Sequence, residues 1–290
     1  MVNNMDVSII IVNYNTCALT NAVITSIIEQ TKDVSFEIIV VDNHSNEPFV
    51  LQNPTGRNVR MVKLNYNAGF GGANNIGSSL ANGRNILFLN PDTRLLNNAV
   101  CILSNFLDNN PQAGACGGNL YDKNLRPAHS FKNRFPSIFN EICDAICAIF
   151  PLKATDFNNG MYAKKVAYVC GACLMVKKII FKQLGGFDKD FFMYYEDTFL
   201  AYCIRQMGYT IHSVPTAQIQ HFEGQSFKLD TDREVRIFES RNLFFAKTHS
   251  KYYNRLSRHI NIFLLFFAKI LTQNEKKRIY SFRYSLYKKQ

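Results

Sequence analysis

The sequence predicts an α/β fold in which helices flank a mostly parallel central sheet. Short runs of β-branched and other apolar residues recur through most of the chain, and segments with helical spacing separate them. A strand that is apolar along its whole length is typical of a parallel sheet covered on both faces. The alternation of such strands with helices indicates a doubly wound sheet.

The elements of this sheet follow one another in order. The first strand is expected at 7–12, a β-branched run. The first helix is expected at 15–30, where Leu19 and Val23 begin a series of apolar residues one turn apart. Further strands are predicted at 36–41, 59–64, 86–89, 166–176 and 210–214, and further helices at 73–81, 97–109 and 196–207.

Two stretches depart from this alternation. Residues 119–165 contain three prolines and an apolar run at 138–150, and we expect an insertion or loop that packs over the sheet. From about residue 234 the chain turns to helical spacing, aromatic residues and positive charge. Two parts are therefore predicted, an α/β domain at 1–233 and a C-terminal helical extension at 234–290.

Composition limits the class of protein. Hydrophobic residues make up 47% of the 290 residues, enough to bury a core. The formal net charge of +11 indicates an anionic partner, which could be nucleic acid, an anionic membrane surface or a phosphorylated ligand. The positive residues are concentrated in the tail and no recognition module is evident, so we expect no nucleic-acid partner.

The chain is expected to work in the cytosol. Residues 1–11 contain neither a basic n-region nor a long apolar h-region, and no run of about 20 apolar residues follows. The eight cysteines do not suggest a disulfide framework. Cys170 and Cys173 lack a second ligand pair at matching spacing, so we expect structural thiols in a buried strand rather than a zinc or redox site.

Polar side chains stand where three predicted strands end. These are Asn13-Tyr14-Asn15, Asp42-Asn43 and Asn90-Pro91-Asp92. Ligands of open α/β sheets bind beyond the carboxyl ends of the strands, so the three segments could line one crevice. Each alone is also an ordinary turn sequence.

A glycine-rich turn at 67–77 (NAGFGGANNIG) follows the third predicted strand. Gly69 and Gly71 suggest a dinucleotide fingerprint, but its third glycine would fall at Asn74 and the turn does not follow the first strand. We expect a turn that brings the backbone close to a ligand, with Asn74 at the start of the next helix. A plain flexible loop is the alternative.

Taken together, the motifs resemble the family 2 inverting glycosyltransferases, and within them a rhamnosyltransferase-like branch. They are VSIIIVNYNT at 7–16, VDNHS at 41–45, the glycine-rich turn, FLNPDTRL at 88–95, GACLM at 171–175, GGFD at 185–188, FFMYYED at 191–197, HFEGQS at 221–226 and SRN at 240–242. The resemblance covers about residues 6–250. It implies a GT-A fold and a nucleotide-diphosphate sugar donor.

The resemblance also implies roles in binding the donor. Asp42 would accept a hydrogen bond from the imide N–H of a pyrimidine base. Asp92 matches the last acid of a DxD-type motif, and with His221 it would hold Mg²⁺ or Mn²⁺ against the diphosphate. Asn90 replaces the first acid of that motif. The implied donor site comprises Asn13, Tyr14, Asn15, Asp42, Asn67, Gly69, Gly71, Asn74, Asn90 and Asp92.

Glu196 and Asp197 match the acidic pair of the family, with Asp197 as the catalytic base. An acceptor hydroxyl must lose its proton as it attacks the anomeric carbon opposite the departing diphosphate. The alternative interpretation makes both acids helix N-terminal residues that favour the helix dipole. The branch often has a further acid two positions after Asp197, where this chain has Phe199.

The tail contains an apolar segment, 261–271, that is too short to span a bilayer. Basic residues flank it, namely Lys251, Arg255, Arg258, Lys269, Lys276, Lys277 and Arg278. We expect a helix at an anionic membrane surface, on the inner face of the bacterial cytoplasmic membrane. A helix packed on the catalytic domain with a solvated basic rim is the alternative.

The sequence therefore predicts transfer of L-rhamnose from dTDP-L-rhamnose to a surface polysaccharide or lipid-linked glycan. One alternative is a UDP-sugar-dependent transferase of the same fold, and another is a non-catalytic, membrane-associated protein that binds sugar nucleotides. A nucleotidyltransferase would want a glycine-rich loop with a basic residue after the first strand, and residues 13–16 contain neither.

Overall fold

The computed structural model describes residues 5–47, 49–52, 58–149, 156–222, 231–272 and 274–289. The chain separates into two compact units. The first comprises Met1–Asn133, Thr155–Phe192 and Glu196–Lys228, and the second comprises Arg134–Ala154, Met193–Tyr195 and Leu229–Gln290. A functional division of the chain at 233–234 stays a prediction.

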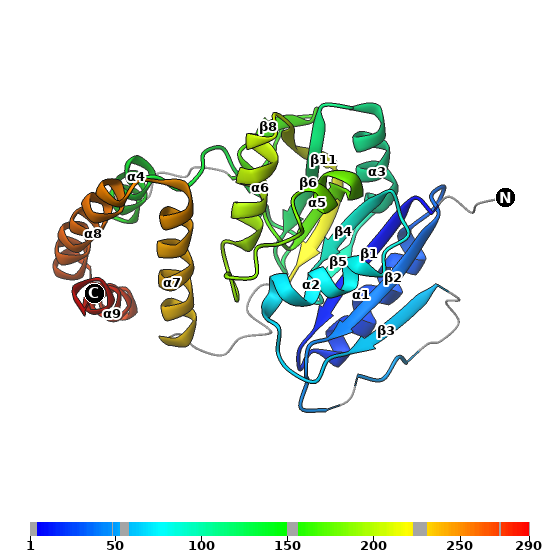
Figure 1. Ribbon diagram of the computed structural model, residues 1–290, viewed down its shortest axis with the longest axis horizontal. Coiled ribbons are helices and arrows are strands. Elements are labelled where there is room, and N and C mark those ends of the chain that lie inside the picture. The colour runs from blue at the N-terminus through cyan, green and yellow to red at the C-terminus, as the bar shows by residue number, and fades with distance from the viewer. Residues whose placement is uncertain are drawn as a thin grey trace. The chain divides into compact units, whose positions relative to one another are not determined.

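The first unit is built on a nine-stranded sheet with the strand order β3-β2-β1-β4-β10-β6-β11-β5, and β8 pairs with β11 (Figure 1). Its strands are β1 (Val7–Asn13), β2 (Phe36–Asp42), β3 (Val59–Lys63), β4 (Asn85–Leu89), β5 (Thr93–Leu95), β6 (Ala113–Tyr121), β8 (Lys164–Val166), β10 (Cys173–Lys177) and β11 (Thr210–His221). β1 runs parallel to β2 and β4, and β2 to β3, whereas β10 is antiparallel to both its neighbours. The mostly parallel sheet predicted from the sequence is confirmed.

Helices of the first unit cover both faces of this sheet. They are α1 (Cys17–Gln30), α2 (Gly69–Ser79), α3 (Ala99–Asn109), α5 (Lys178–Gln183) and α6 (Glu196–Gln206). Ile9 belongs to a buried cluster that includes residues of α1 and α3. Ile10 points the other way, because successive strand residues face opposite sides. A Cβ at Gly77 of α2 would lie 2.6 Å from Ile10, and Phe88, opposite Ile10 in the sheet, contacts Phe181 of α5.

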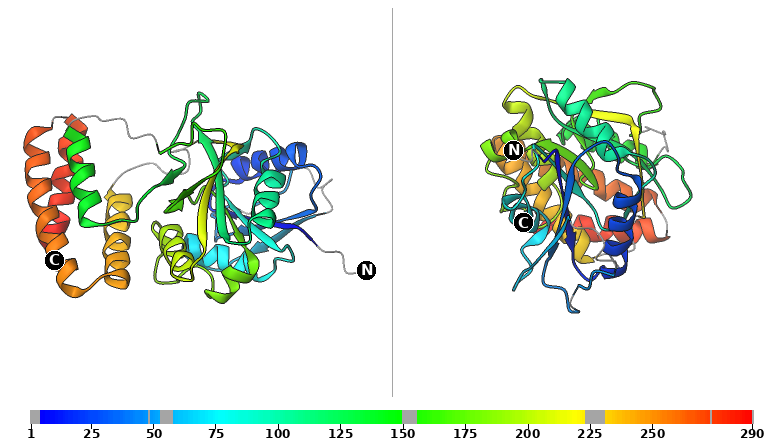
Figure 2. Two further views of the ribbon diagram at one scale, coloured as in Figure 1. Left: turned by 90° about the horizontal axis from the view of Figure 1, so that it is seen from above. Right: turned by 90° about the vertical axis from the view of Figure 1, so that its right-hand side faces the viewer.

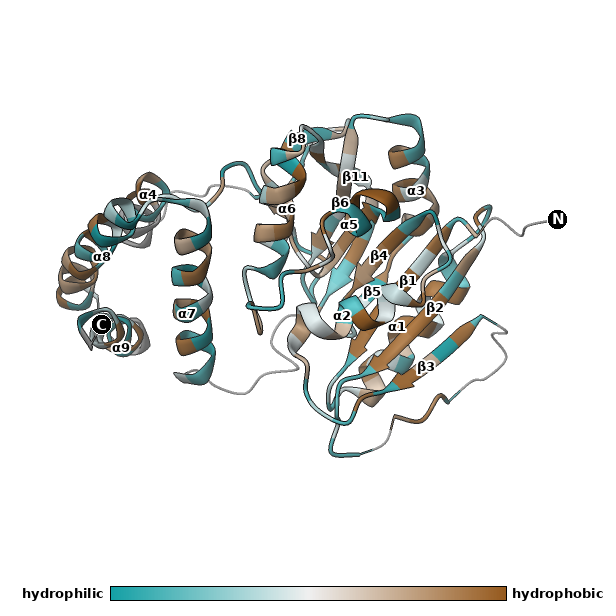
Figure 3. Cartoon of the chain, viewed as in Figure 1, coloured by the Kyte–Doolittle hydropathy of each residue, from teal (hydrophilic) through white to brown (hydrophobic). Residues whose placement is uncertain are grey.

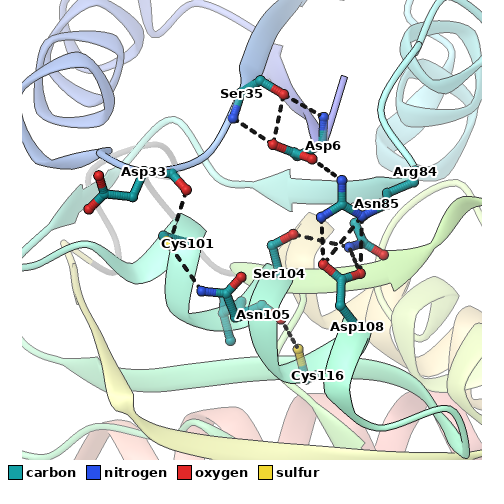
Figure 4. A network of polar contacts seen from close by, with 11 residues as sticks. Asp6, Asp33, Ser35, Arg84, Asn85, Cys101, Ser104, Asn105, Asp108 and Cys116 are labelled. Carbon is teal, nitrogen blue, oxygen red and sulfur yellow. Dashed lines mark hydrogen bonds and ion pairs between the residues drawn. The ribbon is translucent and has the colours of Figure 1, made fainter. Parts of the chain in front are cut away.

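Burial on both faces explains why β1, β2 and β4 are almost continuously apolar (Figure 3). At the amino-terminal edge of these strands, polar side chains form a network of hydrogen bonds and ion pairs (Figure 4). Arg84 pairs with Asp6 and donates to Asp108 Oδ2 at 2.6 Å. Asn85 also donates to Asp108, at 3.1 Å, and the Ser35 hydroxyl donates to Asp6 at 2.7 Å. The opposite, carboxyl-terminal edge carries the polar strand ends.

Three segments differ from their sequence-based expectation. α2 begins at Gly69 rather than at residue 73. Glycines have low helix propensity and therefore hide the start of the helix in the sequence. Packing of α2 against the sheet stabilises the helix in spite of them. The strand expected at 166–176 is interrupted at residue 167 and at 170–172. It is divided among the end of β8, β9 (Tyr168–Val169) and β10, and β9 pairs with β7 (Phe131–Lys132). The strand expected at 210–214 continues to His221 as β11.

The expectation that the whole of 119–165 forms an insertion over the sheet is wrong. Its two ends lie within β6 and β8 of the sheet. Within the apolar run at 138–150, the described residues form helix α4 (Ile138–Ile149), which belongs to the second unit and packs against α8. Its acid Glu141 explains this placement, because its partners lie on helices more than 90 residues further along the chain.

The second unit is helical and contains α4, α7 (Thr231–Thr248), α8 (Lys251–Leu271) and α9 (Asn274–Lys289). α4 (green), α8 (orange) and α9 (red) lie side by side in Figure 2. Arg241 of α7 is 5% exposed and donates to Glu141 at 2.6 Å. Ser257 and Asn261 of α8 donate to the other oxygen of Glu141 at 2.9 and 2.8 Å. None of the helices in the described ranges is long and apolar enough to cross a bilayer.

Cys173 lies in a buried strand as expected, whereas Cys170 is half-buried and lies in the turn that precedes this strand. Cys173 is buried in β10 and burial raises the pKa of its thiol to about 11. Burial likewise raises the pKa of the Cys116 thiol well above its usual range. The thiolate is the reactive form of cysteine, so burial that keeps these two thiols protonated fits a structural role.

Candidate active site

The ends of β1 and β2 hold Asp42 in one fixed orientation. The two strands pair so that Asn13 lies opposite Asp42. Asn13 Nδ2 and Ser45 Oγ donate to Asp42 Oδ1 at 2.8 and 2.5 Å. Thr16 and Thr20 donate to Asn13 Oδ1 and fix its amide. Asp42 is 1% exposed, and its Oδ2 accepts no hydrogen bond from the described residues. It can therefore accept one from a ligand.

The loops around Asp42 are joined by short polar contacts. Asn15 lies at φ 56°, its N–H donates to Ser45 Oγ at 2.9 Å, and its Oδ1 accepts from Asn46 N–H at 2.8 Å. Tyr14 between Asn13 and Asn15 is 41% exposed. An aromatic ring that stands out of the first loop is available for contact with a planar base.

The glycine-rich turn is anchored to the end of β2. Asn43 accepts from Ala68 N–H at 2.8 Å and donates to Asn67 Oδ1 at 2.9 Å. Gly69 has φ +73°, and a Cβ there would lie 2.3 Å from the carbonyl oxygen of Phe192. Only glycine fits that position. Asn43 was expected only as part of a polar strand end and Ser45 was given no role, although both lie in the VDNHS motif.

Asn74 lies within α2 rather than at its start. It is 1% exposed, and its side-chain amide donates to the carbonyl of Phe70 at 3.0 Å. Gly71 lies in the first turn of α2, where a Cβ would be 3.0 Å from Phe187 Cβ and 3.6 Å from Glu196 Cβ. The turn and the acidic pair thus lie close together at Gly71.

Asp92 and His221 are brought together by strands β5 and β11. His221 ends β11 opposite Thr93 of β5, and its Nε2 lies 3.4 Å from Asp92 Oδ1. Asp92 is 4% and His221 9% exposed. Asn90 Oδ1 is buried and has no donor among the described residues. The motif positions 223–226 after His221 lie outside the described residues.

These groups fit a divalent cation whose remaining ligands come from a substrate. The part of the chain that the structure describes holds no group of three His, Cys, Asp or Glu residues that could bind a metal. Mg²⁺ sites often use only one or two carboxylates together with substrate phosphates. A carboxylate, an imidazole and the unpartnered amide oxygen of Asn90 would suit Mg²⁺ or Mn²⁺ in that setting.

Glu196 and Asp197 begin α6 and have different surroundings. Asp197 Oδ1 accepts from the N–H and hydroxyl of Thr198 at 2.6 and 3.1 Å, and its Oδ2 accepts from Gly171 N–H at 2.8 Å. Glu196 is 6% exposed, and its Oε2 has no partner among the described residues. Asp197 is half-buried. The two acids follow Tyr194 and Tyr195, whose φ values of 70° and 65° are costly for residues other than glycine.

The surroundings shift the pKa of both acids. Burial and the charge of Asp197 raise the pKa of Glu196 to about 8. Burial raises the pKa of Asp197 too, but hydrogen bonds from Thr198 and Gly171 and the charge of His129 act against that rise. His129 belongs to none of the sequence motifs, and its Nδ1 lies 3.2 Å from Asp156 Oδ2.

Phe199, which stands where the branch often has an acid, packs among apolar groups. Its ring lies 5.3 Å from that of Phe191 and 6.3 Å from that of Tyr202. It also lines a cavity of about 330 Å³ together with Leu200 and Cys203. This position therefore contributes packing instead of a third carboxylate.

Known proteins resemble this chain in sequence. The chain matches the family model described as Glycosyl transferase family 2 over residues 8–185. It is 25% identical over 211 residues to the N-acetylglucosaminyl-diphospho-decaprenol L-rhamnosyltransferase of Mycobacterium tuberculosis, covering 67% of this chain and 68% of that protein. It is 27% identical over 241 residues to the dTDP-rhamnosyl transferase RfbF of Shigella flexneri, covering 81% and 72%.

A solved structure shares the fold. The crystal structure of GalNAc-T7 with UDP, GalNAc and Mn²⁺ matches with a TM-score of 0.58 at 15% identity, covering 85% of this chain. The chain spans about half, 51%, of that longer chain. The likeness confirms the GT-A fold expected from the sequence.

Proposed function

Because the chain belongs to glycosyl transferase family 2 and is a sugar-transferring enzyme of glycan biosynthesis, we propose that it is an inverting transferase that uses a pyrimidine-nucleoside diphosphate sugar. The first donor to test is dTDP-L-rhamnose, and the acceptor is a glycan or lipid-linked glycan. The observation that carries the proposal is the buried Oδ2 of Asp42, which accepts no bond from the described residues.

In this proposal, Asp42 accepts the imide N–H of the base. Uracil and thymine both present such a donor, so a carboxylate oxygen held by Asn13 and Ser45 selects pyrimidines of this type over cytosine, whose ring nitrogen there accepts. Tyr14 provides an exposed ring beside this position. The turn at Asn67 and Gly69 brings the backbone of α2 to the donor side of the site.

The reaction needs a base for the acceptor. Asp197 takes the proton of an acceptor hydroxyl, and the oxygen forms a bond to the anomeric carbon while the bond from that carbon to the diphosphate oxygen breaks. The electron pair of the broken bond leaves with the diphosphate, and a single displacement inverts the anomeric centre. Gly171 N–H and Thr198 hold the carboxylate in place for this step.

Asp92 and His221, with Asn90 beside them, would hold Mg²⁺ or Mn²⁺. When bound, such a cation neutralises charge on the departing diphosphate. The oxygen-rich donor set supports this assignment, and the relative solved with Mn²⁺ shares the fold.

The sugar itself is proposed from the relatives. The two relatives described above are named as rhamnosyltransferases, and one name specifies a dTDP donor. The test is to incubate the enzyme with lipid-linked glycan acceptors and either dTDP-L-rhamnose or UDP-sugars, and to measure nucleoside diphosphate release and product mass. Transfer from dTDP-L-rhamnose supports the proposal. Transfer from a UDP-sugar alone would replace the donor and keep the enzyme class.

We also propose that the second unit places the enzyme on the inner face of the bacterial cytoplasmic membrane. One face of α8 exposes large apolar residues, namely Tyr252, Leu256, Phe263, Phe267, Ile270 and Leu271. Lys251 and Arg255 on α8 and Lys277 and Arg278 on α9 are also exposed. The side chain of Lys276 lies outside the described part. An apolar face with basic neighbours favours an anionic lipid surface.

A further inference from the structure

The two acids that begin α6 contact different parts of the site. The backbone of Gly171, in the turn between β9 and β10, donates to Asp197. Glu196 instead packs beside Gly71 in the first turn of α2, the helix that follows the glycine-rich turn. If the proposed function is correct, Glu196 is on the side of the donor, and Asp197 is on the side of the acceptor.

The available hydrogen-bond donors are divided unequally between the two carboxyl groups. Asp197 accepts three hydrogen bonds, two of them from backbone N–H groups. Glu196 has a buried Oε2 without any donor among the described residues, and only its own backbone N–H stabilises its charge. A buried, ionised oxygen without a donor is costly, and a second carboxylate next to it adds repulsion. A proton on Glu196 removes both the cost of the buried charge and the repulsion from Asp197.

From this arrangement we propose that Glu196 is a neutral carboxylic acid in the resting enzyme and donates a hydrogen bond to a hydroxyl oxygen of the donor sugar. Asp197 alone then acts as the base. This inference rests on the proposed function for the identity of its ligand, but not for the position of the proton. Like-charged carboxyl groups in close contact commonly hold one proton between them.

The pKa directions agree with this assignment. Burial, followed by the charge of Asp197, raises the pKa of Glu196 to about 8. The charge of Asp197 acts on Glu196, and the charge of His129 lowers the pKa of Asp197. α2 contains no titratable residue, so its packing against Glu196 adds burial without charge. The strained backbone at Tyr194 and Tyr195 precedes the buried side chain, as expected where function constrains the chain.

The first test needs no substrate. Infrared difference spectra of the free protein are recorded between pH 6 and pH 9, a range that includes the Glu196 pKa of about 8, for wild type, Glu196→Gln and Asp197→Asn. We expect a carboxylic-acid carbonyl band that disappears as the pH rises past about 8 in wild type and is absent from Glu196→Gln. A band that persists in Glu196→Gln, or a wild type with no protonated carboxyl at pH 6, would overturn the proposal.

The second test separates the sugar from the nucleotide. Glu196→Ala should weaken binding of the intact nucleotide-sugar about tenfold, as expected for one lost hydrogen bond, and leave binding of the bare nucleoside diphosphate unchanged. Glu196→Gln, whose amide can still donate, should bind both ligands as wild type does and keep its activity above pH 8, where wild-type activity falls. The proposal would be refuted if Glu196→Ala and Glu196→Gln lost the same affinity for the nucleotide-sugar. It would also be refuted if the activity of Glu196→Gln fell above pH 8 as wild-type activity does.

These outcomes are distinct from failure of the proposed function. If no nucleoside diphosphate binds to wild type, the proposed function fails, whereas the infrared result still reports where the proton lies. If the diphosphate binds and the band belongs to another group, only the inference about Glu196 fails.

Discussion

Gly171 donates its backbone N–H to Asp197 Oδ2 at 2.8 Å, and a Cβ added to Gly171 would lie 2.8 Å from that same oxygen. The carboxylate of the proposed base therefore occupies space that only a glycine leaves open. The contact links the turn between β9 and β10 to the start of α6.

Gly171→Ala should reduce the transfer rate about 100-fold while nucleotide binding stays unchanged, because a shift of about 1 Å in a reacting group costs that much. Steady-state kinetics together with calorimetric binding would check this. Gly160→Ala is the control, since a Cβ there meets only the Asn158 side chain at 3.2 Å and the Tyr162 backbone at 4.0 Å. Full activity in Gly171→Ala would show that Asp197 needs no such fixed position.

Removing either member of the Asp92–His221 pair should weaken cation-dependent binding. For Asp92→Asn and His221→Ala we expect nucleoside diphosphate affinity in the presence of Mn²⁺ to fall at least about tenfold. Affinity without the cation should change little. Titration calorimetry with Mn²⁺ and with a chelator measures both. If Mn²⁺ enhances binding equally in wild type and both variants, the cation is held elsewhere.

Acid should weaken the sheet edge at Asp108. Burial alone would raise its pKa, but hydrogen bonds from Arg84 and Asn85 and nearby positive charge lower it below its ordinary value. A lowered folded-state pKa stabilises the fold above the unfolded-state pKa of about 3.9, and this stability is lost as pH falls through the folded value.

We therefore expect Asp108→Asn to cost about 1 kcal/mol of unfolding free energy at pH 7 and progressively less below about pH 5. Thermal unfolding between pH 7 and pH 3 measures this difference. Glu29→Gln, at an exposed acid of α1, should unfold like wild type across the range. A gap between wild type and Asp108→Asn that grows towards low pH would contradict the account.

The exposed apolar face of α8 should bind membranes. Replacing Phe263 and Phe267, which are 63% and 43% exposed, with serine should reduce co-sedimentation with vesicles rich in anionic phospholipid about tenfold or more, since burying each ring contributes more than 1 kcal/mol. Tyr162→Ser is the matched control, because its ring is 84% exposed on the first unit. Equal binding of the two variants, or equal binding to neutral vesicles, would exclude this surface.

Much of the site could be predicted because its residues lie directly after strands that are recognisable from the sequence alone. Apolar strands that end in polar residues place Asp42 and Asp92 at the carboxyl edge, and the structure has strands ending at or just before both positions. The motif order also indicated the family, which is confirmed. The roles assigned to individual site residues stay predictions.

Other features depend on distant contacts and could not be predicted. The position of α4 follows from the pairing of Glu141 with Arg241, one hundred residues away. The start of α2 at Gly69 depends on the carbonyl of Phe192, which bonds Phe70 N–H and leaves no room for a side chain. The different surroundings of Glu196 and Asp197 likewise depend on contacts with distant segments, since Gly71 lies beside Glu196 and Gly171 donates to Asp197.

The central claim is that Asp42 receives a pyrimidine base, and calorimetric titration of wild type and Asp42→Asn with TDP, UDP and CDP tests it most directly. We expect TDP and UDP to bind wild type more tightly than CDP, and Asp42→Asn to lose about tenfold or more of the TDP affinity. Glu29→Gln should bind as wild type does. Wild-type protein that binds none of the nucleotides, or an Asp42→Asn variant with unchanged TDP affinity, would contradict the account.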